Sequence, residues 1–410
     1  MVKWMFKPRP SKFGGGISLL FRGSDPKMVN GFIRNQLTFN KTHSENSRVT
    51  EFLFESARSA IYNVLVSQGI GKGDEVIVSS FTCEAVTYAV TRAGANVVYV
   101  DINDDLTMLD EDVLAAVTKK TKAVMMQNTF GRLGLQLSTI ESLRSYGLFI
   151  IEDCALAIGS KLNNDLLGSF GDVSFWSLEV SKTVTTGWGG VLTTNNKQSR
   201  KALIERQKIL GRISILSDLR RLFQLWFSTL MMKVKLPGAI FIWYFMYGSR
   251  IFRRSNSFGG QHPTQYELMG KFSCDLYFYI KPSLDNIFRL TNQNYNELNM
   301  EADKLRLNCP VSPRKGEFVV APRFSLIVPA ARIQDIDNYA DRLGVEVGRW
   351  FTDCPPKLGL SKAKIYSSNN ANAISKNIIN LPCHWTLSKL ELDQVKLLMK
   401  YISFFDDSVK

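Results

Sequence analysis

Between residues 55 and 195, segments with the apolar spacing of a helix alternate with short runs of β-branched and aromatic residues. The helical spacing predicts helices at 57–67, 83–93, 109–117 and 139–146. The apolar runs predict buried strands at 75–78, 97–101, 123–126, 148–151, 173–177 and 190–194. Repeated β-α units of this length build a mostly parallel sheet with helices on both faces. Ligands of such sheets bind beyond the carboxyl ends of the strands, so the residues that follow each strand are the candidates for chemistry.

Polar side chains follow two of these predicted strands. Asp153 comes after the strand at 148–151. The next strand ends with Ser177 and is followed by Ser181 and Lys182, and a glycine-rich loop then leads into the last strand. Pyridoxal 5'-phosphate needs a lysine for its Schiff base, a carboxylate at its pyridine nitrogen, and hydroxyls and amides for its phosphate. We therefore predict a site for this cofactor.

The composition excludes several other kinds of site. A chain of 410 residues favours two domains with a sizeable core. The six cysteines include no C-x-x-C pair, and only three histidines occur. We therefore expect neither a disulfide framework nor a bound metal, and a reducing compartment fits best. The chemistry must depend on lysine, aspartate, serine and a cofactor.

The net charge of +14 is concentrated in one segment. Residues 200–254 contain twelve basic and two acidic residues, which is +10 of the +14. The rest of the chain is nearly neutral, so we expect no nucleic-acid partner. The same segment holds the most apolar run of the chain, at 222–248. Basic and apolar residues together favour a membrane surface.

We predict that residues 212–254 are an insertion that forms a helical hairpin in the membrane interface. The arms at 222–232 and 239–247 are apolar, and a Pro-Gly pair between them breaks the helix. Each arm is too short to span a bilayer, which needs about 20 apolar residues. The alternative is that the same apolar faces pack against a partner subunit. The N-terminus shows no signal peptide, so we expect a cytoplasmic protein that is peripheral at the inner face of the membrane.

Several further stretches occur in a characteristic order: Phe54–Ile61, Gly73–Thr82, Ala93–Ile102, Lys122–Val124, Ile151–Ala155, Gly168–Asp172, Trp176–Lys182 and Gly187–Gly190. In order and spacing they resemble the DegT/DnrJ/EryC1/StrS family of pyridoxal-phosphate sugar aminotransferases. A weaker likeness continues through Gly344–Trp350 and Leu381–His384. The resemblance covers most of residues 50–400.

The resemblance implies a role for individual residues. Lys182 is similar to the lysine that forms the Schiff base and moves a proton between cofactor and substrate. Asp153 resembles the partner of the pyridine nitrogen. Cys83 stands where many members place an aromatic residue over the cofactor ring. The phosphate ligands that the resemblance implies are Ser177, Ser181, Ser59 and the backbone around Ala57 and Arg58.

The sequence departs from the family pattern at a few positions. Leu156 replaces a common glutamine, and Trp188 stands in the glycine-rich loop where members have an acidic or small polar residue. The asparagine that reaches the partner subunit's phosphate is not evident, and residues 267–271 occupy its place. These departures bear on the identity of the substrate.

The resemblance implies an α/β protein of fold type I. We expect an N-terminal arm at 1–50, a large domain with a mostly parallel seven-stranded sheet at 51–290, and a smaller C-terminal α/β domain at 291–410. The implied function is transfer of an amino group, from an amino-acid donor such as glutamate, to a nucleotide-linked keto sugar for polysaccharide or glycoconjugate synthesis. A homodimer is implied as well, because members build each site from two chains.

Two other functions are alternatives to this one. A non-catalytic, membrane-associated regulator or scaffold could keep the fold, but retention of both Lys182 and Asp153 argues against it. A pyridoxal-phosphate enzyme with a different reaction, such as sugar dehydration, is the other alternative. The similar dehydratases carry histidine at the lysine position, so Lys182 argues against that reaction as well.

Overall fold

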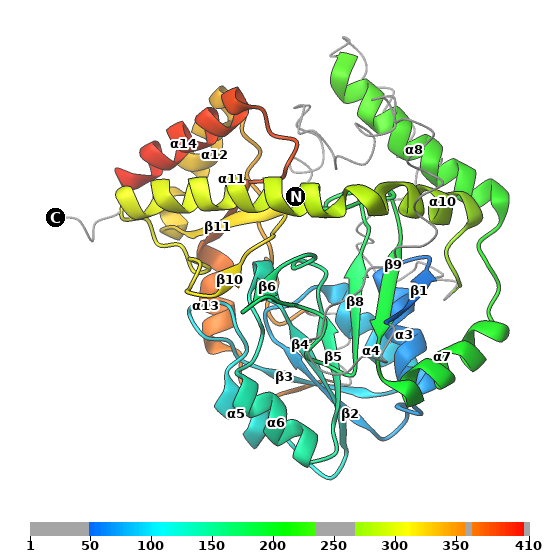
Figure 1. The fold of residues 1–410 in the computed structure, drawn as a ribbon. Coiled ribbons are helices and arrows are strands. Elements are labelled where there is room, and N and C mark those ends of the chain that lie inside the picture. The colour runs from blue at the N-terminus through cyan, green and yellow to red at the C-terminus, as the bar shows by residue number, and fades with distance from the viewer. Residues whose placement is uncertain (1–48, 235–266, 357–362, 406–410) are drawn as a thin grey trace.

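The computed structural model describes residues 49–234, 267–356 and 363–405 (Figure 1). Its largest element is an eight-stranded sheet in the order β1-β9-β8-β5-β4-β2-β3-β12. The strands from β8 to β12 in this order run parallel, and β9 is antiparallel to both of its neighbours. The strands are β1 (Thr50–Phe54), β2 (Glu75–Ser79), β3 (Asn96–Val100), β4 (Thr121–Gln127), β5 (Phe149–Asp153), β8 (Val173–Ser177), β9 (Gly190–Thr194) and β12 (Ala363–Ile365).

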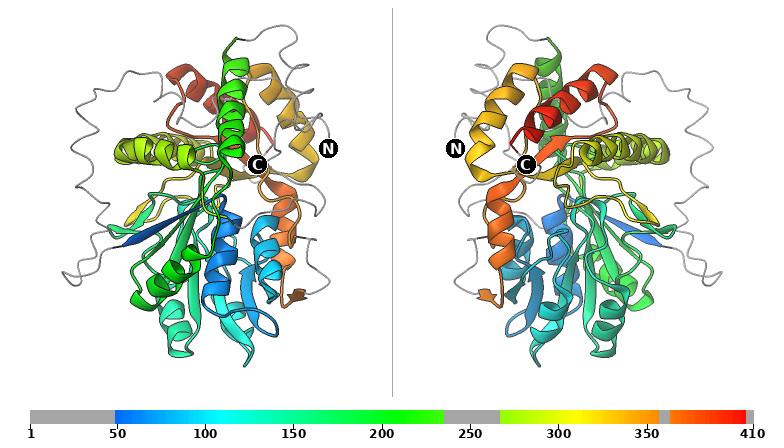
Figure 2. Two further views of the ribbon diagram at one scale, coloured as in Figure 1. Left: turned by 90° about the vertical axis from the view of Figure 1, so that its right-hand side faces the viewer. Right: turned by 90° about the vertical axis from the view of Figure 1, so that its left-hand side faces the viewer.

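Helices cover both faces of this sheet, because its strands are apolar on both sides (Figure 2). Along β2, Val76 and Val78 face one helical layer, whereas Ile77 between them faces the other. The first layer contains α3 (Ala57–Ser67), α4 (Glu84–Ala93) and α7 (Lys197–Lys208), and the second contains α5 (Asp110–Ala115) and α6 (Leu137–Ser145). The carboxyl ends of β5 and β8 therefore lie side by side between two packed layers.

The C-terminal region, here the described residues from Leu284 onward, forms a second apolar core. Its antiparallel pair β11 (Arg323–Ile327) and β13 (Ile378–Pro382) packs with helices α11 (Leu284–Lys304), α12 (Ile333–Leu343) and α14 (Lys389–Ser403). Between β12 and β13 lies α13 (Asn369–Asn377). A small sheet joins β10 (Glu317–Phe318) of this region to β6 (Lys161–Leu162) and β7 (Asp165–Leu166).

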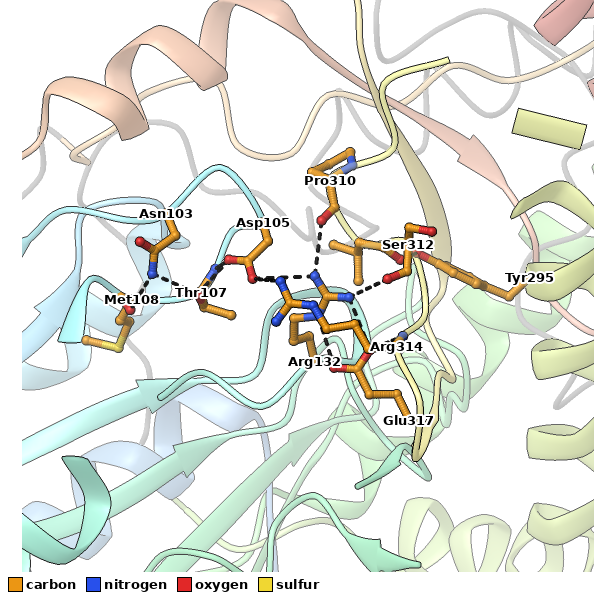
Figure 3. Close-up of polar contacts among 11 residues, drawn as sticks. Asn103, Asp105, Thr107, Met108, Arg132, Tyr295, Pro310, Ser312, Arg314 and Glu317 are labelled. Carbon is orange, nitrogen blue, oxygen red and sulfur yellow. Dashed lines mark hydrogen bonds and ion pairs between the residues drawn. The ribbon is translucent and has the colours of Figure 1, made fainter. Parts of the chain in front are cut away.

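A buried arginine connects the C-terminal region to the main sheet (Figure 3). Arg132 lies just after β4, and its guanidinium donates to both carboxylate oxygens of Glu317 at 3.1 Å. It also donates to the carbonyl oxygens of Pro310 and Ser312 and lies 3.5 Å from Asp105. Burial raises the pKa of the Asp105 carboxyl, but hydrogen bonds from Thr107 and the nearby guanidiniums outweigh burial and hold it below its ordinary value. The loop after β4 is thereby fixed to the C-terminal region.

Helix α8 (Ile215–Val234) extends away from the sheet and contacts α10 (Lys271–Ile280). The polarity of its first turns is the reverse of the usual surface helix. Asp218, Arg221 and Gln224 are buried against the protein. The exposed side carries the apolar residues Ile215, Leu216, Leu219 and Phe223. Across the described residues, we find no helix with the length and apolarity that a bilayer crossing requires.

The predicted fold class is confirmed, with helices and strands close to their expected bounds. The sheet has eight strands where seven were expected. The additional strand β12 is three residues long, and Lys364 and Ile365 in it are exposed, so it lacks the apolar run of a buried strand. The first predicted arm of the hairpin, at 222–232, falls within α8, which begins earlier, at Ile215. The second arm of the hairpin, and residues 1–48 of the N-terminal arm expected at 1–50, lie outside the described residues.

Candidate active site

Asp153 is the last residue of β5 and lies at the carboxyl edge of the sheet. Its side chain is buried, and one carboxylate oxygen accepts a hydrogen bond from the Ala155 N–H at 2.9 Å. Burial raises its pKa to about 6, while the Ala155 hydrogen bond and the charge of Lys182 act in the opposite direction. Asp153 and Lys182 are therefore close enough to interact electrostatically. Above pH 6 the site contains a buried carboxylate that a cation would stabilise.

The preceding residue, Glu152, points to the other side of the strand and holds the neighbouring loop. Its carboxylate accepts hydrogen bonds from the N–H groups of Gly168, Phe170 and Gly171 and from the Asn128 amide, at 2.6–2.9 Å. Burial raises its pKa even though these hydrogen bonds oppose the shift. Glu152 thus positions the 168–171 loop, which leads directly into β8.

Lys182 lies in the loop between β8 and β9 and is half-buried. Its backbone N–H donates to the Glu179 carbonyl at 3.0 Å. Its ammonium lies 4.6 Å from the ring centroid of Trp350, which belongs to the C-terminal region. The Trp350 ring in turn stacks on Phe130, from the loop after β4, with a centroid distance of 6.5 Å and an interplanar angle of 9°. The Trp350 ring therefore lies against the lysine, and Phe130 supports that ring.

Two serines flank Lys182, and both already have partners within the protein. The Ser177 hydroxyl, at the end of β8, accepts from the Glu179 N–H at 3.4 Å. Ser181 donates from its hydroxyl to the Glu179 carboxylate, which also accepts from the Ser181 N–H at 3.0 Å. A phosphate at this point would have to replace the Glu179 carboxylate as the partner of Ser181. Ser177, which only accepts here, keeps its hydroxyl proton for a ligand.

The first turn of α3 lies beside the start of β9. A Cβ on Gly190 would come within 2.4 Å of the Ala57 nitrogen, so only glycine allows this close approach. The Ser56 side chain caps the helix by accepting from the Ser59 N–H at 3.2 Å. The Ser59 hydroxyl donates to the Glu267 carbonyl at 3.2 Å. The amides of Ala57 and Arg58 therefore lie at a helix N-terminus, which favours an anion.

Cys83 caps the N-terminus of α4 and has an exposed side chain. Although the residue is exposed, desolvation of the thiol by nearby protein atoms raises its pKa. The charges of Lys182, Asp153 and Arg58 also act on it, which places these four predicted site residues in one neighbourhood. Because its pKa is raised, Cys83 is a neutral thiol at pH 7 and offers a small apolar surface rather than a nucleophile.

The structure adds residues to this site that strand-end patterns did not reveal. Trp350 lies over Lys182 and is stacked on Phe130, and Glu152 holds the loop before β8. Glu152 stands beside Asp153 in a stretch that carries the family resemblance, and Trp350 ends another, so both were within reach of sequence reasoning. Of the departures, Leu156 packs in the C-terminal apolar core, and Trp188 is buried within the glycine-rich loop.

Comparison with known proteins agrees with this architecture. Residues 49–216 match the model of the DegT/DnrJ/EryC1/StrS aminotransferase family. A solved structure of NtdA from Bacillus subtilis, with bound cofactor PMP, shares the fold at a TM-score of 0.64 and 18% identity, over 87% of this chain and 74% of that one. The fold is therefore the α/β fold of the sugar aminotransferases. The match to this family model covers residues 49–216 and does not extend to the rest of the chain.

Two curated relatives each match about a third of the chain. The GDP-perosamine synthase of Escherichia coli O157:H7 is 40% identical over 139 residues, which is 34% of this chain and 38% of that protein. The UDP-N-acetyl-3-dehydro-alpha-D-glucosamine 3-aminotransferase of Acidithiobacillus ferrooxidans is 36% identical over 150 residues, or 36% and 41% of the two chains. The matches thus span about two fifths of these relatives.

Proposed function

We propose that this protein is a pyridoxal-phosphate-dependent aminotransferase that acts on a nucleotide-linked keto sugar. The observation that carries the proposal is the electrostatic coupling of a buried carboxylate, Asp153, with the amine of Lys182 at the carboxyl edge of a parallel sheet. The match of residues 49–216 to the model of an aminotransferase family supports the same function.

The residues at this edge fit the cofactor. Its carbonyl carbon would bond to the Lys182 amine, and its protonated pyridine nitrogen would donate to Asp153, whose buried charge lacks a full counter-charge without it. Its phosphate would accept from the Ala57 and Arg58 amides and from Ser177. Ser59 and Ser181 remain predicted ligands, although both hydroxyls have protein partners here. When bound, the cofactor supplies an electron sink for the carbon that gains or loses the amino group.

The chain itself holds and moves protons. Asp153, ionised above pH 6, keeps a proton on the ring nitrogen. The Lys182 amine accepts a proton from the reacting carbon on one side and returns it on the other. The indole of Trp350 excludes water from one side of this amine and limits where it can move.

The names of the relatives support the substrate class. One is named for amino transfer to a UDP-linked dehydro sugar, and another for synthesis of a GDP-linked amino sugar. We propose glutamate as the amino donor and polysaccharide or glycoconjugate synthesis as the setting. The purified protein should convert a member of a panel of nucleotide keto sugars to an amino sugar when glutamate is supplied. A protein that binds no pyridoxal 5'-phosphate, or that turns over none of the panel with any amino acid, would contradict the proposal.

We also propose a cytoplasmic homodimer that touches the membrane through α8. The outward apolar side chains of α8 and the basic charge of this segment suit an anionic lipid surface. Replacing Leu216, Leu219 and Phe223 with glutamine should abolish co-sedimentation with vesicles containing anionic lipid. The exposed Leu390 and Leu397 of α14 provide a matched control when changed in the same way. If the α8 variant instead becomes monomeric while vesicle binding is absent in both proteins, these residues form the subunit interface.

A further inference from the structure

The buried side of α8 makes specific polar contacts with the rest of the chain. Asp218 accepts hydrogen bonds from the N–H groups of Phe272 and Ser273, at 2.8 and 3.2 Å, and thereby caps α10. Gly270 permits this approach, because a Cβ there would lie 2.2 Å from the Asp218 carboxyl carbon. Helix α8 is therefore held in place by its charges.

One turn further along, Arg221 reaches the segment that begins α3. Its guanidinium lies 2.8 Å from the Glu55 carboxylate, with both side chains at most 9% exposed. Glu55 immediately precedes Ser56, the N-cap of α3. The Glu55 N–H donates to the Glu267 carbonyl at 3.1 Å, and the Ser59 hydroxyl donates to the same oxygen. The ion pair and these hydrogen bonds together fix the chain at the entrance to α3.

Arg221 places a positive charge beside two carboxylates at this turn, those of Glu55 and Glu267. Burial is the main cause that raises the pKa of the Glu267 carboxyl; the charge of Glu55 also raises it, and that of Arg221 lowers it. Both carboxylates and the guanidinium therefore lie within electrostatic reach of one another. A carboxylate one residue before the N-cap opposes the binding of an anion at the same helix end. Because Glu55 is buried, solvent screens this repulsion only weakly.

We propose that Arg221 is a positioning residue for the cofactor phosphate. It neutralises Glu55 and holds the turn whose next amides, those of Ala57 and Arg58, face the anion. This inference rests on the proposed function, because it takes the phosphate to bind at α3. Helix α8 thereby has two proposed roles. Its outward apolar side contacts the membrane, and its buried Arg221 sets how strongly the phosphate binds at α3.

The test compares two ligands that differ only in the phosphate. Dissociation constants for pyridoxal 5'-phosphate and for pyridoxal are measured by quenching of the intrinsic tryptophan fluorescence. Arg221→Met should weaken binding of the phosphorylated ligand by roughly tenfold or more, which corresponds to about 1.4 kcal/mol per factor of ten. Binding of pyridoxal, which depends on Lys182 and Asp153, should change by less than about threefold.

Three further variants separate charge from structural damage. Glu55→Gln combined with Arg221→Met should restore the phosphate-dependent affinity, because the carboxylate that opposes the anion is gone. Arg221→Lys, which keeps the charge, should bind like the unchanged protein and serves if the methionine variant does not fold. Lys208→Met breaks an exposed ion pair with Glu205 on α7 and should leave both constants unchanged.

Several results would overturn the inference. Equal losses for pyridoxal and its phosphate in Arg221→Met, or no loss for either, would show that Arg221 has no role specific to the phosphate. If the unchanged protein binds pyridoxal 5'-phosphate no better than pyridoxal, the phosphate does not bind at α3 and the inference fails. If it binds neither ligand, the proposed function fails as well.

Discussion

The ammonium of Lys182 lies 4.6 Å from the ring centroid of Trp350, although the two residues are 168 positions apart in the chain. Lys182 follows strand β8 of the main sheet, and Trp350 comes from the C-terminal region. A cation over an indole face at this distance is stabilised by the ring, most strongly where water is excluded. The surroundings of the candidate catalytic amine therefore come from both the main sheet and the C-terminal region.

Replacing Lys182 with alanine should abolish the visible absorbance of bound pyridoxal 5'-phosphate and all amino transfer, because the candidate site then lacks the amine that bonds to the cofactor. The fold should survive, since the side chain is only half-buried. Absorbance spectra test the loss of the bound cofactor, and circular dichroism tests whether the fold survives. Lys122→Ala, at an exposed position on β4, is the control. Turnover by pure Lys182→Ala protein would refute the assignment.

Replacing Trp350 with alanine should lower kcat by roughly tenfold or more, because the Lys182 amine loses the ring that limits its position. Trp350→Phe should recover most of the rate, since phenylalanine restores an aromatic face. Steady-state kinetics should therefore show the order Trp, Phe, Ala in kcat. If all three proteins share the same kcat, the ring does not position the amine.

Replacing Asp153 with asparagine should leave the protein able to bind the cofactor but lower its activity by orders of magnitude. A neutral amide cannot keep the ring nitrogen protonated, and the lost charge-assisted hydrogen bond alone is worth about 1.5–3 kcal/mol. Single-turnover rates measured at saturating cofactor isolate this effect from binding. A near-normal rate would remove Asp153 from the mechanism.

The same Asp153→Asn change should make the cofactor-free protein more stable at pH 7. Burial raises the folded-state pKa from 3.8 to about 6, so the folded protein binds this proton more tightly than the unfolded chain. The contribution of Asp153 to stability therefore falls as the pH rises from about 4 to about 6 and then stays constant. The variant should gain on the order of 2–3 kcal/mol above pH 6 and almost nothing at pH 4. Urea denaturation of both proteins across this pH range measures the difference in the free energy of unfolding. A difference that does not change with pH would contradict the prediction.

Replacing Arg132 with methionine should lower the free energy of unfolding by about 3–5 kcal/mol, because the Glu317 carboxylate would remain buried without its ion-pair partner. Arg314 provides the matched control, since it contacts the same Asp105 but is largely exposed (Figure 3). Arg314→Met should cost less than about 1 kcal/mol. Similar losses for the two variants would mean that burial of Arg132 does not determine its contribution.

The sequence predicted those helices and strands whose apolar spacing and caps lie within their own residues. Helix α3 was expected at 57–67 and is found there, because apolar spacing and a serine cap both occur within its own sequence. Asp153 and Lys182 were predicted as site residues because each follows a predicted strand, and the structure brings them within electrostatic reach of each other. Trp350 was not assigned to the site, because its place over Lys182 depends on how the C-terminal region docks. The reversed polarity of α8 was missed for a similar reason: the sequence shows which residues are apolar but not which side the protein covers.

The contacts of the buried Asp218 and Arg221 limit which residues of α8 can be deleted without damage to the rest of the protein. A cut that begins at residue 213, chosen to remove the apolar segment, would also remove Asp218 and Arg221, and would leave the first amides of α10 and the Glu55 carboxylate without these partners. A soluble fragment is better obtained by cutting after Gln224, or by changing only the outward side chains. Loss of activity after the longer deletion would therefore report damage to internal anchors rather than loss of contact with lipid.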